Sequence, residues 1–83
     1  MNMQAQEIIT QVTEIFRDVL DNPEIVLNEA TTAMDIEEWD SLNHIQLIVA
    51  IEKHFKVKFT SAEISGFKNV GEMCQTIQNK LAA

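Results

Sequence analysis

The sequence predicts an all-α fold, a four-helix bundle with a short third helix and a long loop between helices 1 and 2. Only two glycines and one proline occur in 83 residues, so few positions interrupt a helix. Apolar residues recur three and four positions apart, which places them on one helix face. Two four-residue sequences typical of helix starts, at 60–63 and 69–72, divide the second half of the chain. The length suits a single domain, residues 1–83.

The first helix is expected from about Gln4 to Leu20, and Pro23 follows closely enough to end it. No period is sustained from Pro23 to Asp40, so this segment is predicted to be a loop. A loop of this length in so small a domain is usually functional or required by the topology. The face of the first helix comprises Ile8, Val12, Ile15, Phe16 and Val19, and the apolar loop residues Ile25, Leu27, Ala30, Met34 and Ile36 should hold the loop to the core.

The second helix is expected to begin at Asp40 or Ser41, because either side chain can accept a hydrogen bond from a free N–H group of the first turn. It is the most apolar helix, with more than one face occupied, and should therefore be central in the bundle. The core is expected to include Met34, Ile48, Phe55, Met73 and Ile77.

Two shorter signals place the remaining helices. Thr60 and Glu63 form a capping box that opens a short helix, and Gly66 is expected to terminate it as a glycine C-cap. Asn69 is the expected cap of the last helix. Its apolar face comprises Val70, Met73, Cys74, Ile77 and Leu81, and Cys74 should face the core as a small hydrophobic residue.

Acidic residues dominate the charge, with 13 acids, 6 Lys or Arg residues and a net charge of −7. Such a surface repels phosphate backbones, so nucleic acids and anionic membranes are poor candidate partners. Proteins with basic patches are better candidates, although a purely solubilising surface explains the composition equally well. Eight acids and no Lys or Arg lie between positions 18 and 40, namely Asp18, Asp21, Glu24, Glu29, Asp35, Glu37, Glu38 and Asp40.

The chain is expected to be a cytoplasmic monomer. Its single cysteine cannot form an intrachain disulfide. The N-terminal segment lacks the basic flank and apolar run of a signal peptide. No apolar stretch approaches the roughly 20 residues that span a bilayer.

Ser41 places a hydroxyl group at the start of a helix, directly after the acidic loop. Helix N-termini present free N–H groups and a partial positive charge, which favour a phosphate ester electrostatically. A hydroxyl group at this position is also exposed to a modifying enzyme. The alternative is that Ser41 is only an N-cap, which is the ordinary explanation of an isolated Asp-Ser-Leu sequence.

Asp40-Ser41-Leu42 is not isolated, and its surroundings resemble the acyl carrier protein family. The resemblance is specific from about Met34 to Ile77, whereas the first helix matches only in length and period. The downstream apolar spacing and the second capped helix make the pattern strong. The matching residues after Leu42 are Ile45, Leu47, Ile48, Ile51, Glu52, Phe55, Val57 and Phe59, then Ala62 to Ile64, Phe67 and Asn69 to Met73.

The resemblance implies a non-catalytic carrier that a phosphopantetheinyl transferase modifies. Ser41 would receive 4′-phosphopantetheine from coenzyme A, and the terminal thiol would hold acyl or aminoacyl cargo as a thioester. Asp40 would help to orient the transferase complex. Loading, condensing or transferring enzymes with basic patches would then read the second helix and the preceding acids. The partner-binding residues implied in this way are Glu37, Glu38, Trp39, Leu42, Ile45 and Glu52.

Several positions depart from the common fatty-acid pattern. Glu38 and Trp39 precede Asp-Ser-Leu, where a glycine and a small or medium apolar residue are usual. Asn43 and Gln46 stand in place of acids, and Lys53 occupies a position that is often acidic. The sequence Trp-Asp-Ser-Leu looks more like discrete carriers of specialised pathways, which handle amino-acyl, polyketide or cell-envelope building blocks. Fatty-acid and specialised synthesis both remain open.

Trp39 has two interpretations of its own. The ring either packs over the end of the bundle and fixes the loop, or contacts a partner or the arm, since aromatic residues often anchor interfaces. Ser41 and His44 are close enough on one helix to suggest a hydrolase. A chain this short offers neither an oxyanion hole nor a substrate pocket for that chemistry. His44 is therefore expected to be a partly exposed surface histidine, and His54 is expected to be a cation at the helix C-terminus or a neutral surface group.

Metal binding is poorly supported. The acids at 35–40 lack the central glycine of a calcium-binding loop, because Asp40 occupies its place. One cysteine and two histidines at these spacings cannot build a tetrahedral zinc site. The runner-up to a carrier is an acidic helical interaction module that shares the fold but leaves Ser41 unmodified.

Overall fold

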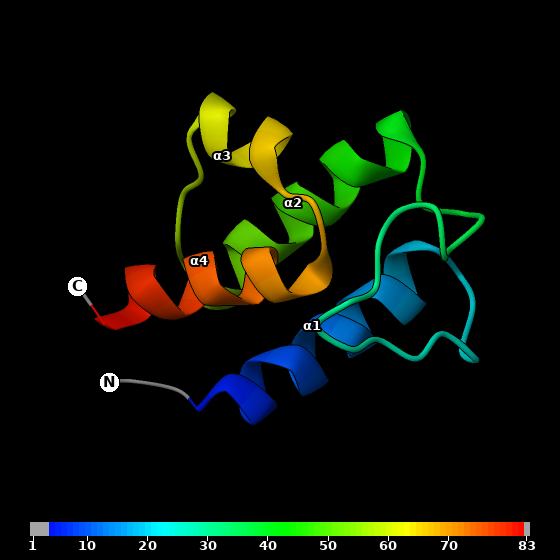
Figure 1. Ribbon diagram of the computed structural model, residues 1–83, viewed down its shortest axis with the longest axis horizontal. Helices are drawn as coiled ribbons and strands as arrows, with labels where there is room; N and C mark the ends of the chain where they lie inside the picture. The colour runs from blue at the N-terminus through cyan, green and yellow to red at the C-terminus, as the bar shows by residue number, and fades with distance from the viewer. Residues whose placement is uncertain (1–3, 83) are drawn as a thin grey trace.

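The computed structural model describes residues 4–82. These residues form four α-helices and no strand, which confirms the predicted all-α fold (Figure 1). The third helix is short, and a long loop separates the first two, as expected. The helices are α1 (Ala5–Val19), α2 (Ser41–Phe55), α3 (Ser61–Gly66) and α4 (Val70–Ala82).

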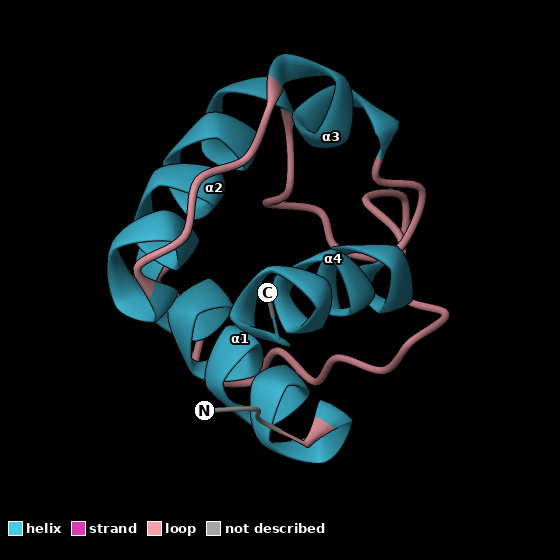
Figure 2. Ribbon diagram, turned by 90° about the vertical axis from the view of Figure 1, so that its left-hand side faces the viewer, coloured by secondary structure: helices cyan, strands magenta, loops and turns pink. Residues whose placement is uncertain are grey.

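Helix α1 packs against both α2 and α4 and runs in the opposite direction to both (Figure 1). The start of α1 and the end of α4 lie at one end of the molecule, and the start of α2 lies at the other, beside the long loop. Turned by 90°, the molecule shows α3 set apart from the α1–α4 pair, at the top of the view (Figure 2). Residues next to Ser41 are therefore surrounded by loop and by α3.

A left-handed residue ends α1 before the proline is reached. Asp21 has a φ of 52°, and the N–H of Asn22 donates to the carbonyl of Arg17 at 3.0 Å. This closing bond satisfies one of the free carbonyls at the helix C-terminus. The proline then prevents any continuation of the helix.

Three of the five loop residues that were predicted to hold the loop to the core do so. Ile25, Leu27 and Ile36 are buried, as predicted, but Ala30 is exposed and Met34 is 96% exposed. The prediction that Met34 belongs to the core is therefore wrong. Met34 lies in a turn without helical or strand periodicity, so its sequence position carried no information about which way its side chain points.

Hydrogen bonds from the loop connect it to the start of α4. Thr31, the buried polar residue of the loop, offers its carbonyl to the N–H of Val70 at 2.8 Å. Its hydroxyl accepts the N–H of Asn28 at 2.9 Å. The predicted cap of α4 is confirmed, since Asn69 Oδ1 accepts the N–H of Glu72 at 2.8 Å. The loop thus caps α4 as well as covering the core.

The segment between α2 and α3 is also closed by side chains. Lys56 ends α2 in the left-handed region with a φ of 59°, and Glu52 Oε2 accepts the N–H of Phe59 at 2.8 Å. The predicted capping box is present, with Thr60 Oγ1 accepting the N–H of Glu63 at 3.1 Å and Glu63 Oε1 accepting the N–H of Thr60 at 2.8 Å. The bond from the Thr60 N–H lowers the pKa of Glu63, and Lys80, at 3.0 Å, lowers it further.

The predicted end of α3 at Gly66 is confirmed, but the conformation of the glycine differs from that of a glycine cap. Gly66 is the last residue of α3 and does not have a positive φ, so it is no left-handed C-cap. Phe67 follows in extended backbone and brings its ring edge-on to Phe59, with centroids 5.5 Å apart. The chain leaves α3 because Phe67 packs inward, and the glycine only permits it.

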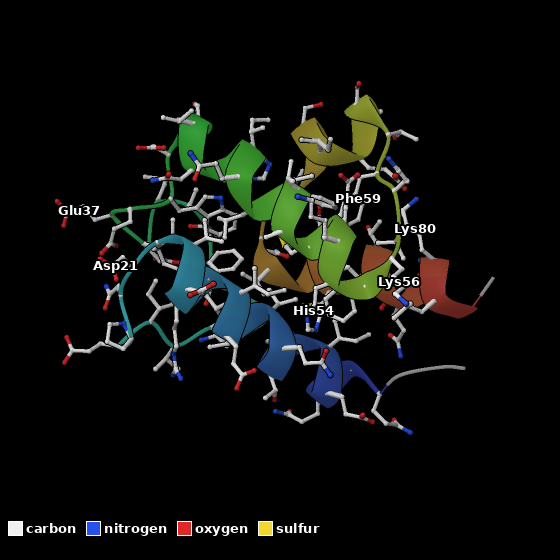
Figure 3. All side chains as sticks on the ribbon, turned by 180° about the vertical axis from the view of Figure 1, so that it is seen from behind. Asp21, Glu37, His54, Lys56, Phe59 and Lys80 are labelled. Carbon is white, nitrogen blue, oxygen red and sulfur yellow. The ribbon has the colours of Figure 1, made fainter. Side chains whose placement is uncertain are left out.

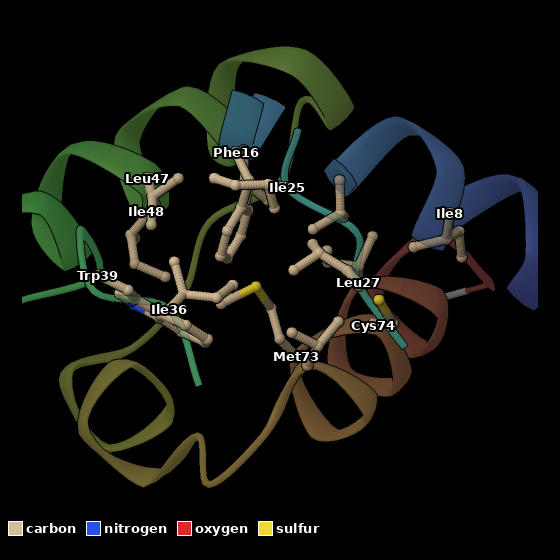
Figure 4. Packing of buried hydrophobic residues seen from close by; sticks show 14 of the residues in the cluster. Ile8, Phe16, Ile25, Leu27, Ile36, Trp39, Leu47, Ile48, Met73 and Cys74 are labelled. Carbon is tan, nitrogen blue, oxygen red and sulfur yellow. The ribbon is translucent and has the colours of Figure 1, made fainter. Parts of the chain in front are cut away.

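The core gathers side chains from three helices and the loop (Figure 4). Phe16, Leu47, Ile51 and Met73 are completely buried, so α2 contributes to the core. The central position predicted for α2 belongs to α1, which packs against both α2 and α4. Cys74 is buried as predicted, and burial, with a smaller effect of the Glu29 carboxylate, raises the pKa of its thiol to about 11.

Candidate functional site

Asp40, not Ser41, is the N-cap of α2. Its Oδ1 accepts the N–H of Asn43 at 2.8 Å, and its carbonyl accepts the N–H of His44 at 2.8 Å. The side-chain amide of Asn43 donates a hydrogen bond to the carbonyl of Glu38 at 2.8 Å. The sequence left the choice of cap open, and these bonds decide it.

Ser41 is consequently free of a capping role. It is the first helical residue, its side chain is exposed, and its hydroxyl makes no hydrogen bond to any residue of the described chain. The N–H groups of the first helical positions have no acceptor within the helix, and they add partial positive charge around this hydroxyl. The alternative that Ser41 is only an N-cap is therefore not supported.

A groove of about 570 Å³ runs beside Ser41, between the start of α2 and α3. One wall carries the loop and the start of α2, and the other carries α3 and the link that follows it. Lys68 is the cation of this groove and Asp40 is its acid. The lining residues are Ala33, Trp39, Asp40, Ser41, His44, Ile45, Ile64, Ser65, Phe67 and Lys68.

Trp39 is buried, with only 7% of its surface exposed. Its indole ring meets the ring of Phe16 edge-on, with centroids 5.0 Å apart, and lies among the core side chains in Figure 4. This arrangement confirms that Trp39 packs over the end of the bundle and fixes the loop. Because the ring is buried, little of its surface is available for the alternative role, contact with a partner or with the arm.

His44 is half-buried and was not predicted to have a structural role. Its Nδ1 accepts the indole N–H of Trp39 at 3.0 Å, and its Nε2 lies 3.0 Å from the carbonyl oxygen of Ile64 in α3. The expected partial exposure is confirmed, but these two contacts were not predicted. The pair was missed because Trp39 precedes the helix, so no helical spacing links it to His44.

The two glutamates that precede Ser41 differ in their exposure and in their hydrogen bonds within the protein. Glu37 is exposed and forms no hydrogen bond within the described chain, and Figure 3 shows it projecting from the loop. Glu38 is half-buried, and its Oε2 accepts the side-chain amide of Asn22 at 2.9 Å. Glu37 is thus available to a partner, whereas Glu38 holds the loop to the end of α1.

An apolar stripe follows Ser41 along the outer face of α2. Leu42 is 70% exposed, Ile45 is 52% exposed and Val49 is 43% exposed. These residues lie three and four positions apart, so they share one face. Glu52, predicted to contact partners, lies further along the helix but is half-buried and bonded to the Phe59 N–H.

Neither a cluster of metal ligands nor a membrane-spanning helix occurs among the described residues. Residues 4–82 contain no group of three or more His, Cys, Asp or Glu side chains arranged to hold a metal ion. In the same part of the chain, no helix combines the length and apolar character required to cross a membrane.

Comparison with known proteins identifies the family. Residues 10–77 match the family described as the phosphopantetheine attachment site. An acyl carrier protein of Thermosynechococcus vestitus is 38% identical over 98% of this chain and 100% of its own length. The chain belongs to the acyl carrier protein family.

Further members of this family support the assignment. An acyl carrier protein of Acidothermus cellulolyticus is 29% identical over 95% of this chain and 94% of its own length. The solution structure of the holo acyl carrier protein of Geobacter metallireducens superposes with a TM-score of 0.85 at 45% identity, covering 90% of this chain and 86% of that one.

Membership establishes what kind of protein this is. It is a non-catalytic carrier that holds its cargo as a thioester on covalently attached 4′-phosphopantetheine, which a transferase supplies, and it interacts with biosynthetic enzymes. An unmodified interaction module is not favoured. The residues at the start of α2 fit such a group, since a free exposed hydroxyl lies beside a groove that also contains a lysine. The bound arm supplies the thiol that forms the thioester.

Proposed function

We propose that Ser41 is the residue to which 4′-phosphopantetheine is attached. The observation that carries this proposal is the unbonded, exposed hydroxyl of Ser41 at the first position of α2. Asp40 supports it by accepting the Asn43 N–H, which holds the first turn in shape without using the serine. Asp40 would also face the transferase, because its side chain is exposed beside Ser41.

Serines elsewhere on the surface are worse candidates. Ser65 lines the same groove, but its hydroxyl donates to the carbonyl of Ser61 at 2.9 Å. Ser61 opens α3, a helix of six residues, and lies outside the groove lining. Ser41 alone combines the groove, an unbonded hydroxyl and the N-terminus of a 15-residue helix.

Partner enzymes are proposed to dock over Ser41 and the apolar stripe of Leu42, Ile45 and Val49. Exposed apolar side chains beside the attachment site offer a partner a contact surface from which water is excluded. Glu37 lies at the same end of the molecule (Figure 3). Charge attraction to Glu37 increases the rate of encounter without requiring tight binding. A carrier needs this combination because it must leave each enzyme again.

We propose a specialised pathway in preference to housekeeping fatty-acid synthesis. Glu52 is the one acid of α2, and its carboxylate already accepts the Phe59 N–H. The exposed cations Lys53, Lys56 and Lys58 lie at the far end of α2, with Lys56 labelled opposite Glu37 in Figure 3. A suitable partner would therefore carry basic residues near Ser41 and acidic residues near the lysines. Loading assays with amino-acyl, polyketide and fatty-acyl donors would separate these cargo classes.

The carrier is proposed to act as a cytoplasmic monomer, with residues 1–83 forming one domain. A net charge of −7 opposes self-association, and most large apolar side chains are buried in a single cluster. Light scattering coupled to size exclusion would measure the mass in solution, and a dimer would contradict this part of the proposal.

Intact mass spectrometry tests the attachment site. The unmodified protein, coenzyme A and a promiscuous phosphopantetheinyl transferase are incubated together, and the adduct is located by peptide mapping. Wild-type protein and Ser65→Ala should each gain one phosphopantetheine group, and Ser41→Ala should gain none. Normal modification of a folded Ser41→Ala variant would refute the site.

A further inference from the structure

The contacts of His44 specify one protonation state. The indole N–H of Trp39 can only donate, so His44 Nδ1, 3.0 Å away, must be an unprotonated acceptor. The carbonyl of Ile64 can only accept, so His44 Nε2, at 3.0 Å, must carry a proton. Only the neutral imidazole with its proton on Nε2 makes both bonds.

The same ring connects three elements of the fold. It belongs to α2, and it lies nearly parallel to the Trp39 indole, with centroids 6.0 Å apart and an angle of 24° between the planes. Trp39 in turn meets Phe16 of α1 edge-on. Through Ile64, the imidazole also connects to the short helix α3. Displacement of the ring would therefore remove a contact of both the loop and α3.

Helix α3 has few other connections to the bundle. It contains no buried residue, and Ile64 is only partly buried against the core. Glu63 forms a solvent-accessible ion pair with Lys80 of α4 at 3.0 Å. Six residues are too few to form a stable helix without tertiary support. The bond from His44 is therefore a substantial part of what holds α3 beside the groove.

We propose that His44 is a positioning residue that latches α3 and Trp39 to α2, and that protonation of its imidazole breaks the bond to Trp39 while keeping the bond to α3. In the imidazolium, Nδ1 carries a proton that faces the indole N–H of Trp39, so this hydrogen bond is lost and two donors oppose each other. Histidine is the side chain that ordinarily changes charge between pH 5 and 8. Acidification therefore frees the indole of Trp39, which lines the groove beside Ser41, whereas Nε2 still donates to the carbonyl of Ile64.

The charged groups that face His44 do not replace the lost bond. Asp40, at the start of its own helix, and Lys68, in the link after α3, are the charged residues that line the groove with it. The Asp40 carboxylate is occupied by the Asn43 N–H, and Lys68 carries a charge that repels the imidazolium. The significance of the latch for the arm depends on attachment at Ser41, but the latch itself does not.

Trp39 is the only tryptophan, so its indole N–H gives a single resonance that reports the first bond. Two-dimensional NMR of the unmodified protein is recorded from pH 8 to pH 5, and hydrogen exchange of the α3 amides is measured as protection, corrected for the intrinsic pH dependence of exchange. Working without the arm makes a failure of this proposal distinguishable from a failure of attachment at Ser41.

Three variants separate the latch from other pH effects. His44→Gln keeps one acceptor and one donor but does not titrate, and His44→Leu removes both bonds. His54→Gln is the matched control, because His54 is the other histidine of the chain and lies near the opposite end of α2 (Figure 3). Should His44→Leu fail to fold, the comparison of wild type, His44→Gln and His54→Gln decides alone.

We expect the wild-type indole resonance to shift on acidification while the protection of α3 is kept, because the imidazolium Nε2–H still donates to the Ile64 carbonyl. His54→Gln should behave as wild type, and His44→Gln should show no pH-dependent shift of the indole resonance. His44→Leu should show the shifted resonance already at pH 8, together with α3 protection lowered about five- to tenfold, the factor associated with one lost hydrogen bond. Persistence of the pH-dependent shift in His44→Gln, or its loss in His54→Gln, would overturn the proposal. So would wild-type protection and indole shift in His44→Leu at pH 8.

Discussion

The N–H of Gly71 donates to the carbonyl oxygen of Glu29 at 2.9 Å, which fixes the long loop to the first turn of α4. A Cβ atom placed on Gly71 would lie 2.9 Å from that oxygen and 3.1 Å from the Cβ of Glu29. Any other residue at position 71 would therefore push the loop away from the helix. The glycine is required for close approach, since its φ is not positive.

Gly71→Ala is accordingly expected to destabilise the protein by about 1 kcal/mol. Overpacking costs about 1–3 kcal/mol, and the better helix propensity of alanine offsets up to about 1 kcal/mol of that cost. Gly66→Ala is the matched control, because nothing lies within 4 Å of a Cβ at that position. Urea denaturation of both variants measures the difference, and equal stabilities would contradict the requirement for close approach.

Capping by Asp40 makes a second prediction. Asp40→Ala should lower the free energy of unfolding by about 1 kcal/mol, since it removes the acceptor of the Asn43 N–H. Ser41→Ala should change it by less than about 0.5 kcal/mol, because the serine hydroxyl is exposed and unbonded. Thermal and urea unfolding of the two variants, compared with wild type, measure this contrast. A larger loss in Ser41→Ala than in Asp40→Ala would reverse the assignment of the cap.

The helices were predictable because each carries a local signal. Periodicity gave α1 within about one residue at each end, and the capping box gave the start of α3. No such local signal tells whether a side chain in a loop points to the core or to solvent. Met34 was therefore wrongly assigned to the core, although Ile36, two residues later, is buried. Sequence alone also suggested a glycine cap at Gly66, although Lys56 and Asp21 adopt the left-handed conformation instead.

The candidate site was predictable to a similar extent. Ser41 and Asp40 were singled out, but both are good caps, so only the observed hydrogen bonds could separate their roles. Glu38 and Glu52 were taken as surface charges, whereas each accepts a hydrogen bond from within the fold. Such contacts depend on the tertiary arrangement, so they cannot be predicted from composition or residue spacing.

Electrostatic steering makes a third prediction, centred on Glu37. Glu37→Lys should slow association with a phosphopantetheinyl transferase several-fold at low salt, because it reverses an exposed charge near Ser41 without removing an internal bond. The effect should diminish near physiological ionic strength, where the Debye length is about 8 Å. Stopped-flow or surface-based kinetics at two salt concentrations would measure it.

Glu14→Lys supplies the control for this charge reversal. Glu14 is exposed on α1 and lies outside the groove lining, so the change in net charge is the same while its location differs. Equal slowing in Glu14→Lys would show that net charge alone sets the association rate. Glu38→Lys and Asp40→Lys are less informative, because each would also break a bond that holds the loop or the helix start.

The buried thiol of Cys74 makes a fourth prediction, which concerns stability at alkaline pH. Burial, and to a lesser degree Glu29, raise the pKa of Cys74 from 9.0 to about 11, so the unfolded chain loses this proton at lower pH than the folded protein. The thiol's contribution to stability is therefore complete below pH 9 and is lost as the pH rises towards 11. The difference in unfolding free energy between wild type and Cys74→Ala should be constant at neutral pH and should shrink above pH 9. A difference that stays constant up to pH 11 would show that the thiol ionises equally in both states.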